Sequence, residues 1–111
     1  LDQINHNMAL LKPGLPFAEF NAKSWRIPEK YVANRYSVAL HGVGLADEWP
    51  SVPLHPDFAN AHGGEFAENM TVCVESLIGE QGGKECIKLE TQVVIKKDGA
   101  HRLDTFPWEA H

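Results

Sequence analysis

Two glutamates and one histidine have the residue types and spacing to bind a metal ion. Glu75 and Glu90 each lie near the middle of an otherwise apolar segment that alternates as β-strands do. If the two segments pair through a turn centred on Gly82 and Gly83, the carboxylates face each other about 5 Å apart at Cβ and repel. A divalent cation would cancel that charge. His41 could add an imidazole ligand, which favours iron, manganese, cobalt or zinc over calcium or magnesium.

Each of these residues also has an ordinary structural interpretation. Glu75 and Glu90 could point to solvent on the open face of a two-layer fold, with Lys88 as a neighbour. His41 alone could be a structural histidine that is hydrogen-bonded in a turn. The residues by themselves leave the metal site and these alternatives open.

A second group of polar and aromatic residues surrounds the glycine turn that follows His41. Asp47 and Glu48 could serve acid–base chemistry, or they could brace the turn, where Asp is common. Trp49 could simply pack, and Tyr36 could be a buried tyrosine with a bonded hydroxyl. His62, in the loop beyond, is expected at the surface.

The first half of the chain predicts two helices and a long loop. Residues 1–11 carry apolar side chains at helical spacing, and the Lys-Pro-Gly sequence at 12–14 ends that helix. A second helix is expected from about Pro16 to a point before Pro28, because proline suits the first turn of a helix and disfavours helix before itself. The stretch 50–65 contains three prolines and a Gly-Gly pair and predicts a loop.

The last third predicts three strands. Residues 70–76 and 86–95 alternate between apolar and polar side chains, and residues 79–84 are rich in glycine. Asp98-Gly99 is a strong hairpin signal, after which residues 102–106 predict a shorter strand. The chain therefore has an α+β pattern, with two helices followed by a mostly antiparallel sheet.

Composition narrows the range of partners and compartments. The chain has 111 residues, the size of one domain, and a net charge of −5, which argues against a nucleic-acid binder. No apolar run reaches the roughly 20 residues of a membrane helix, and no signal peptide is visible. Cys73 and Cys86 are too few for a disulfide framework, so we expect both to be reduced and buried in a cytoplasmic protein.

Three motifs in order give the chain a resemblance to the pita-bread metalloenzymes. "HGVGLADEWP", "ENMTVCVES" and "IKLETQVVI" look like the C-terminal half of that superfamily, which includes methionine and Xaa-Pro aminopeptidases, prolidase and creatinase. The resemblance implies that His41, Glu75 and Glu90 are metal ligands, with Glu90 bridging two divalent transition-metal ions. It also implies a homodimer.

The same resemblance implies two further ligands that this chain lacks. The superfamily uses two aspartates on strands upstream of the helix with which this chain begins, and Asp2 lies within that helix. We therefore interpret residues 1–111 as the C-terminal part of a single pita-bread catalytic domain, truncated on its N-terminal side. These residues alone are expected to be inactive.

The residues after His41 separate two activities within the superfamily. The peptidases usually keep a second histidine there, whereas this chain has Asp47. That stretch resembles the dimethylsulfoniopropionate lyases of the DddP type, which keep a tyrosine and an aspartate where Tyr36 and Asp47 stand. The resemblance implies β-elimination of a small-molecule substrate to dimethyl sulfide and acrylate. Asp47 would be the base, and it would work best if burial raised its pKa toward neutrality.

In this interpretation Tyr36 or Trp49 could hold the sulfonium group by a cation–π contact. Two alternatives remain at this point: an Xaa-Pro peptidase-like metallohydrolase of the same fold, and a pita-bread binding module without metal. The missing upstream aspartates would discriminate an enzyme from a binding module.

Overall fold

The computed structural model describes residues 1–60 and 63–108, which form an α+β arrangement of a sheet and a layer of helices. The α-helices are α1 (Asp2–Leu10), α2 (Phe17–Lys23) and α3 (Glu29–Val32), and a short 3-10 helix η1 covers Asp57–Asn60. The strands are β1 (Val38–Gly42), β2 (Ser51–Pro53), β3 (Thr71–Gly79), β4 (Cys86–Lys96) and β5 (Gly99–Arg102).

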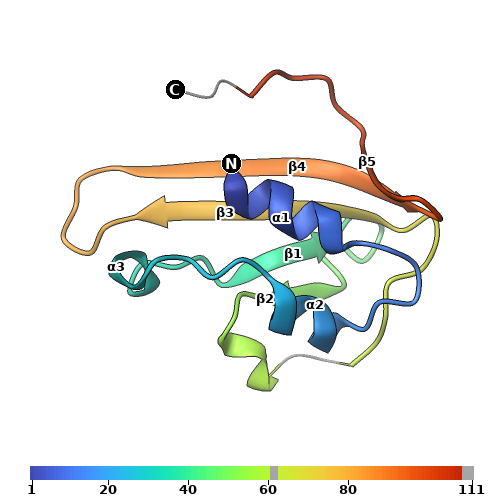
Figure 1. Cartoon of the computed structure of the whole chain (residues 1–111), viewed down its shortest axis with the longest axis horizontal. Coiled ribbons are helices and arrows are strands. Elements are labelled where there is room, and N and C mark those ends of the chain that lie inside the picture. The colour runs from blue at the N-terminus through green and yellow to red at the C-terminus, as the bar shows by residue number, and fades with distance from the viewer. Residues whose placement is uncertain (61–62, 109–111) are drawn as a thin grey trace.

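The sheet is antiparallel throughout and has the strand order β2-β1-β3-β4-β5 (Figure 1). The long β3–β4 hairpin forms its centre, and its register places Glu75 directly opposite Glu90. This confirms the predicted pairing through a turn centred on Gly82 and Gly83. The two carboxylates are therefore forced onto the same face of the sheet at neighbouring positions.

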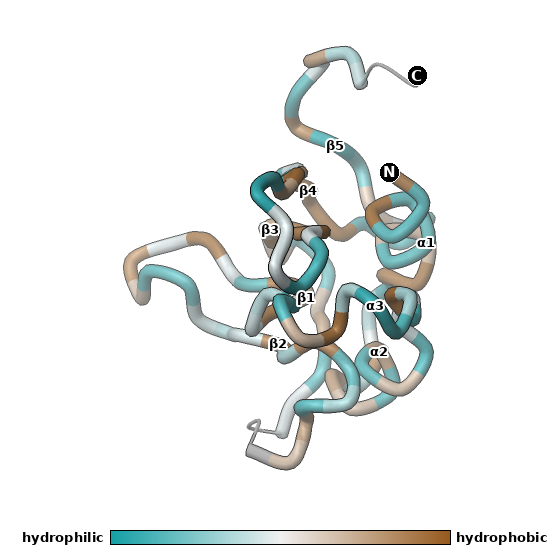
Figure 2. The backbone as a smooth tube through the Cα atoms, turned by 90° about the vertical axis from the view of Figure 1, so that its left-hand side faces the viewer, coloured by the Kyte–Doolittle hydropathy of each residue, from teal (hydrophilic) through white to brown (hydrophobic). Residues whose placement is uncertain are grey.

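The three α-helices lie on one side of the strands (Figure 2). Helix α1 crosses the sheet with Ile4 fully buried, and Phe17 and Phe20 of α2 pack edge-on against Phe66, with ring centroids 4.8 and 5.6 Å apart. The sheet contributes its alternate apolar side chains to the same core: Leu40, Val72, Val74, Val93 and Ile95. The opposite face of the sheet is therefore free to carry polar side chains.

Helices α1 and α2 and the two long strands, β3 and β4, confirm the sequence interpretation. The glycine-turn region and the 50–65 stretch differ from it, because His41 and Gly42 end a strand, β1, and residues 51–53 form a second short strand beside it. These strands have five and three residues, which is too short for a clear alternation of apolar and polar side chains. Helix α3 was also not predicted. His62 lies outside the described residues.

Two expectations were wrong. The last strand covers Gly99–Arg102 rather than 102–106, because the Asp104 carboxylate accepts hydrogen bonds from Thr91 Oγ1 and the Phe106 N–H and turns the chain out of the sheet. Cys86 is exposed, since it lies near the turn on the same face of β4 as Lys88 and Glu90, which the helices do not cover, whereas Cys73 is buried; both thiols are free. Among the described residues, no helix is long and apolar enough to cross a membrane.

Candidate functional site

The candidate site lies on the sheet face opposite the helices. Register alone gathers its side chains: His41 of β1 stands opposite Cys73 of β3, and Glu75, two residues further along β3, stands opposite Glu90 of β4. Because side chains alternate along a strand, all four project from the same face. The fold thus brings the three sequence-predicted metal ligands together.

His41 is buried and held by both ring nitrogens. Nδ1 lies 2.8 Å from the Gly42 carbonyl oxygen, and Nε2 lies 2.9 Å from Glu75 Oε1 and 3.5 Å from Glu90 Oε1. A carbonyl only accepts hydrogen bonds, so Nδ1 must carry a proton. This directs Nε2 toward the two carboxylates, which is the usual orientation of a metal-binding histidine whose other nitrogen is fixed by a hydrogen bond.

Glu75 has an incompletely satisfied carboxylate deep in the protein. Its side chain is 2% exposed, and within the described residues Oε2 makes no hydrogen bond. The nearest cation is the Lys88 ammonium, which lies 3.6 Å from Glu75 Oε2 and 3.6 Å from Glu90 Oε2. Buried carboxylates without full compensation are costly, so this position is suited to an additional cation.

The carboxylates of Glu75 and Glu90 both lie between the His41 imidazole and the Lys88 ammonium. Their Oε1 atoms face His41 and their Oε2 atoms face Lys88. The Lys88 ammonium also lies 4.7 Å from the centroid of the Tyr36 ring. Tyr36 is therefore placed behind Lys88, and one face of its ring already contacts a cation.

Burial and mutual repulsion perturb the ionisable groups. Burial raises the pKa of Glu75, and the Glu90 carboxylate raises it further, against the opposing effects of Lys88 and His41. Burial lowers the pKa of His41, but the Gly42 carbonyl and Glu75 together leave it above its ordinary value. In the metal-free protein, Glu75 and His41 thus hold protons more strongly than they would in the unfolded chain.

We expect the metal-free protein to lose stability as pH rises. Groups with raised folded-state pKa values stabilise the fold fully below their unfolded pKa, and that contribution is lost as pH rises through the folded value. The loss begins above about 4.5 for Glu75 and about 6.5 for His41. Thermal unfolding across this range measures it. Glu75→Gln should flatten the profile, and a wild-type stability that increases across the same range would contradict the expectation.

An open hollow of about 590 Å³ adjoins the carboxylates. The glycine-turn loop after β1 forms one wall with Asp47 and Glu48, and His41, Cys73 and Glu90 lie in the sheet wall. Asp47 has a positive φ of 57°, and its N–H donates to the Gly44 carbonyl at 3.0 Å. The tight turn thereby places its carboxylate at the hollow, although the side chain is exposed and the described residues do not bury it.

Of the two predicted site residues on the glycine-turn loop, Asp47 lines this hollow and Trp49 does not. Its side chain is 58% exposed, and the backbone of Trp49 rather than its ring is what shapes the site. The Gly42 N–H donates to the Pro50 carbonyl at 2.6 Å, so the loop returns directly over the end of β1.

Gly42 is required by this close approach. A Cβ at position 42 would lie 1.9 Å from the Trp49 carbonyl oxygen, whereas a Cβ at Gly44 would meet nothing within 4 Å. We expect Gly42→Ala to destabilise the fold by at least about 2 kcal/mol, because rigid backbone must move. Gly44→Ala is the matched control and should change stability by less than about 0.5 kcal/mol. Denaturant unfolding of both variants measures the difference; equal stabilities would refute the role given to Gly42.

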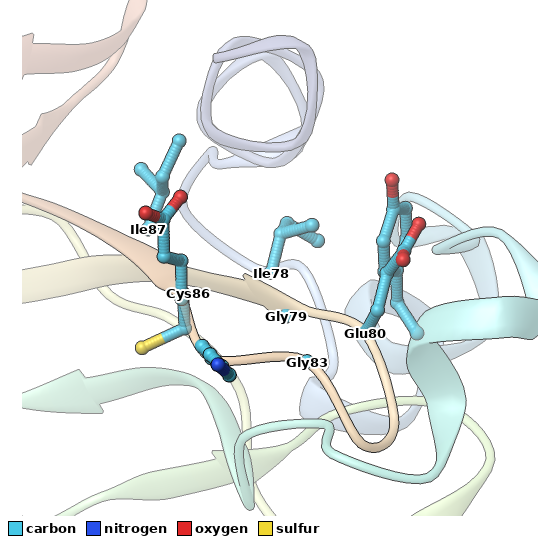
Figure 3. Close-up of a pocket in the computed structure, with 9 residues that line it drawn as sticks. Ile78, Gly79, Glu80, Gly83, Cys86 and Ile87 are labelled. Carbon is cyan, nitrogen blue, oxygen red and sulfur yellow. The ribbon is translucent and has the colours of Figure 1, made fainter.

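A second hollow, of about 410 Å³, lies at the β3–β4 turn (Figure 3). Its walls combine apolar side chains such as Ile78 and Ile87 with Glu80, and Cys86 stands at its edge. None of the predicted site residues lines it. Among the described residues, the predicted site residues that line either of these two hollows, His41, Asp47 and Glu90, all line the first one.

The donor set fits a divalent transition metal. One imidazole nitrogen, directed by its own hydrogen bond, and two converging carboxylates are ligands that such ions accept. The unsatisfied Glu75 Oε2 is the observation that most favours an added cation. Cys73 was missed as a member of this group, although its position two residues before Glu75 in an alternating strand could have placed it on the same face.

This fold and this constellation place the chain among the metallopeptidase-type pita-bread proteins. The sequence model of metallopeptidase family M24 matches residues 1–97, so the chain belongs to that family. A solved structure, prolidase from Pyrococcus furiosus, superposes with a TM-score of 0.71 at 21% identity, covering 96% of this chain and 31% of that one. The chain is thus the C-terminal portion of the pita-bread fold.

Within the superfamily the chain is close to DddP. It is 41% identical over 111 residues to the dimethylsulfoniopropionate lyase DddP of Roseobacter denitrificans, covering 98% of this chain and 25% of that protein. It is 39% identical over 110 residues to DddP of Roseovarius nubinhibens, covering 97% and 24%. The chain therefore spans about a quarter of the length of these relatives.

Proposed function

We propose that the intact protein is a metal-dependent lyase that cleaves dimethylsulfoniopropionate to dimethyl sulfide and acrylate. The observation that carries this proposal is Asp47, a carboxylate on the wall of the hollow beside His41 and Glu90. The similarity of about 40% to two proteins named as DddP lyases supports it. The substrate is a small molecule, and no contact with nucleic acid or membrane is needed.

The metal would be held by His41 Nε2 and by Oε1 of Glu75 and of Glu90. When bound there, a divalent ion supplies Lewis acidity to a substrate carboxylate and so acidifies the neighbouring C–H bond. The proposal includes two divalent ions of iron, manganese, zinc or cobalt, and Glu90 would help to hold both.

Asp47 and Glu48 have different roles in the proposed elimination. The Asp47 carboxylate accepts the α-proton of the substrate, the electron pair of that C–H bond forms the new double bond, and the C–S bond breaks with its electrons going to sulfur. Acrylate and neutral dimethyl sulfide result, so charge and atoms balance. The acidic wall formed by Asp47 and Glu48 attracts the sulfonium cation electrostatically.

Two observations bear on the roles proposed for the aromatic residues Tyr36 and Trp49. One face of the Tyr36 ring contacts the Lys88 ammonium, so a sulfonium group would need the other face or the displacement of Lys88. The Trp49 ring is exposed and is not part of the lining of the hollow. We therefore assign the main recognition of the cation to the carboxylates and a secondary part to Tyr36 and Trp49.

A peptidase is the second candidate, because the family is one of metallopeptidases and a prolidase shares the fold. Headspace detection of dimethyl sulfide from the intact protein tests the first proposal. Cleavage of Xaa-Pro dipeptides without any sulfide would reverse the order. Metal-free protein with neither activity would favour a binding module. The 111 residues alone are expected to be inactive, and a homodimer and a cytoplasmic location belong to the same proposal.

A further inference from the structure

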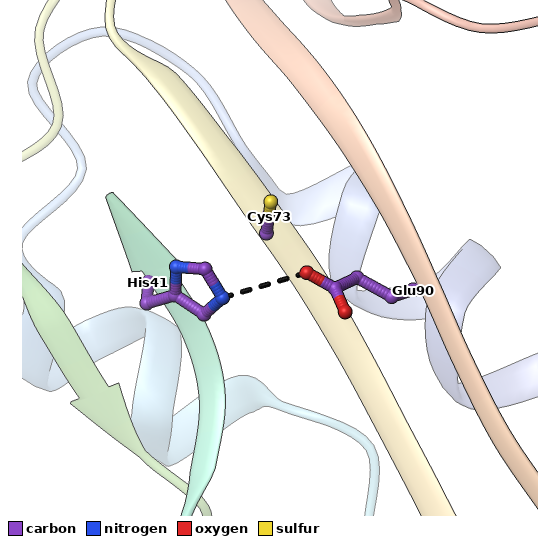
Figure 4. A group of neighbouring side chains, drawn as sticks. All are labelled: His41, Cys73 and Glu90. Carbon is purple, nitrogen blue, oxygen red and sulfur yellow. Dashed lines mark ion pairs between the residues drawn. The ribbon is translucent and has the colours of Figure 1, made fainter. Parts of the chain in front are cut away.

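Cys73 occupies a corner of the candidate metal site that the sequence interpretation left unused. It projects from β3 on the same face as Glu75, and its cross-strand partners are His41 of β1 and Gln92 of β4. Figure 4 shows Cys73 on the strand that runs between the His41 ring and the Glu90 carboxylate. The residue is 8% exposed and lines the hollow, so its sulfur is sheltered but faces the space that a ligand would enter.

The three side chains are close enough to share an ion. A ring nitrogen of His41, the sulfur of Cys73 and a carboxylate oxygen of Glu90 all lie within 4.8 Å of one another. Two donors of one zinc ion lie at most about 4.4 Å apart, the sum of Zn–S at ~2.3 Å and Zn–N at ~2.1 Å. Small side-chain rotations therefore separate this group from a coordination sphere.

We propose that Cys73 is a further metal ligand, which gives the site a sulfur donor beside the nitrogen of His41 and the oxygen of Glu90. This inference rests on the metal site of the proposed function and names the chemical class of its ion. Thiolates select zinc, iron, cobalt or cadmium over manganese and magnesium, which prefer oxygen. A site of nitrogen and oxygen donors alone would lack that selectivity.

The sulfur must lose its proton when the ion binds. Burial raises the pKa of the Cys73 thiol to about 12 in the metal-free protein, and Glu90 adds to that effect. Ion binding thus breaks the S–H bond, releases the proton to solvent and forms the metal–sulfur bond, with no redox change. Glu75 and Cys73 stand on either side of the His41–Glu90 pair, so both can contribute to the same cluster of ligands.

Cobalt substitution of the intact protein tests this ligation directly. We expect a sulfur-to-cobalt charge-transfer band in the near ultraviolet that Cys73→Ser abolishes and Cys86→Ser preserves. Cys86 is the matched control because it is the other free cysteine and is exposed at the start of β4. Zinc affinity should fall by at least about 10-fold in Cys73→Ser, while manganese affinity should stay unchanged.

The Cys73→Ser variant also distinguishes metal ligation by Cys73 from a role in which Cys73 only positions Glu90. It keeps a donor that can hydrogen-bond Glu90 but is a poor soft ligand, so unchanged zinc affinity in Cys73→Ser would overturn the inference. A cobalt spectrum of the wild type without the charge-transfer band would also overturn it. If His41→Ala abolished cobalt binding in that case, the metal site of the proposed function would still be supported. If His41→Ala bound cobalt as the wild type does, the metal site would be refuted as well.

Discussion

Replacing His41 by alanine in the intact protein is expected to lower metal affinity by at least about 100-fold and to remove lyase activity with it. Second-sphere partners of metal ligands commonly contribute 10- to 100-fold in affinity, and the loss of a ligand should cost no less. His41 contributes more than a donor atom, because its Nε2 is also the group closest to the buried Glu75 carboxylate, at 2.9 Å. Isothermal titration with zinc measures the affinity, and sulfide release measures the activity.

The same substitution should also destabilise the metal-free protein. Without the imidazole, the Glu75 carboxylate, 2% exposed, keeps Lys88 at 3.6 Å as its compensating charge within the part of the chain that the structure describes. Leaving a buried polar group unpaired costs about 1–3 kcal/mol. His101→Ala is the matched control, since His101 is half exposed and pairs with Asp98 at the β4–β5 turn. Metal affinity that is equal in the two variants would exclude His41 as a ligand.

The sequence predicted the pair of glutamates from local information. Alternation along β3 and β4 gave the face of each carboxylate, and the glycines between the strands gave the turn. A hairpin pairs residues symmetrically about its turn, so the contact between Glu75 and Glu90 follows once the turn is placed. Local chemistry was sufficient there because the partners lie on consecutive strands.

His41 could not be placed by the same means. Its contacts with Cys73 and Glu75 depend on the pairing of β1 with β3, and the segment between these strands contains β2 and η1 rather than a short turn. Its residue type made His41 a candidate third ligand, but no local pattern placed it beside the glutamates in space. The interaction of Lys88 with both Oε2 atoms depends on side-chain conformation, which alternation alone does not determine.

The end of the sheet was also beyond local prediction. Residues 102–106 have the composition of a strand, but Arg102 and Thr91 both bond the Asp104 carboxylate and draw the chain away from β4. The Leu103 N–H makes the last hydrogen bond to β4, at 2.9 Å from the Gln92 carbonyl oxygen. Side-chain hydrogen bonds of this kind compete with the backbone ladder. As a result, Asp104 lines the hollow instead of standing in a strand.

Replacing Asp47 by asparagine should lower the turnover of the intact enzyme by about 10²- to 10⁴-fold, the usual contribution of a positioned general base. Asparagine has nearly the same shape but cannot accept a proton at neutral pH, so the loss should appear in kcat. Asp47 lies outside the group of three converging ligands, and its N–H bond to the Gly44 carbonyl involves only backbone. Metal affinity and stability should therefore stay at wild-type values.

Glu48→Gln provides the control for this loss, because Glu48 is the neighbouring residue, is also exposed and lines the same hollow. If the loop carboxylates act only by attracting a cationic substrate, the two variants should raise KM to a similar extent and leave kcat nearly unchanged. A base acts at one atom, so only Asp47→Asn should lower kcat. Equal effects on kcat from both substitutions would remove Asp47 from the chemical step and reduce the loop to an electrostatic surface.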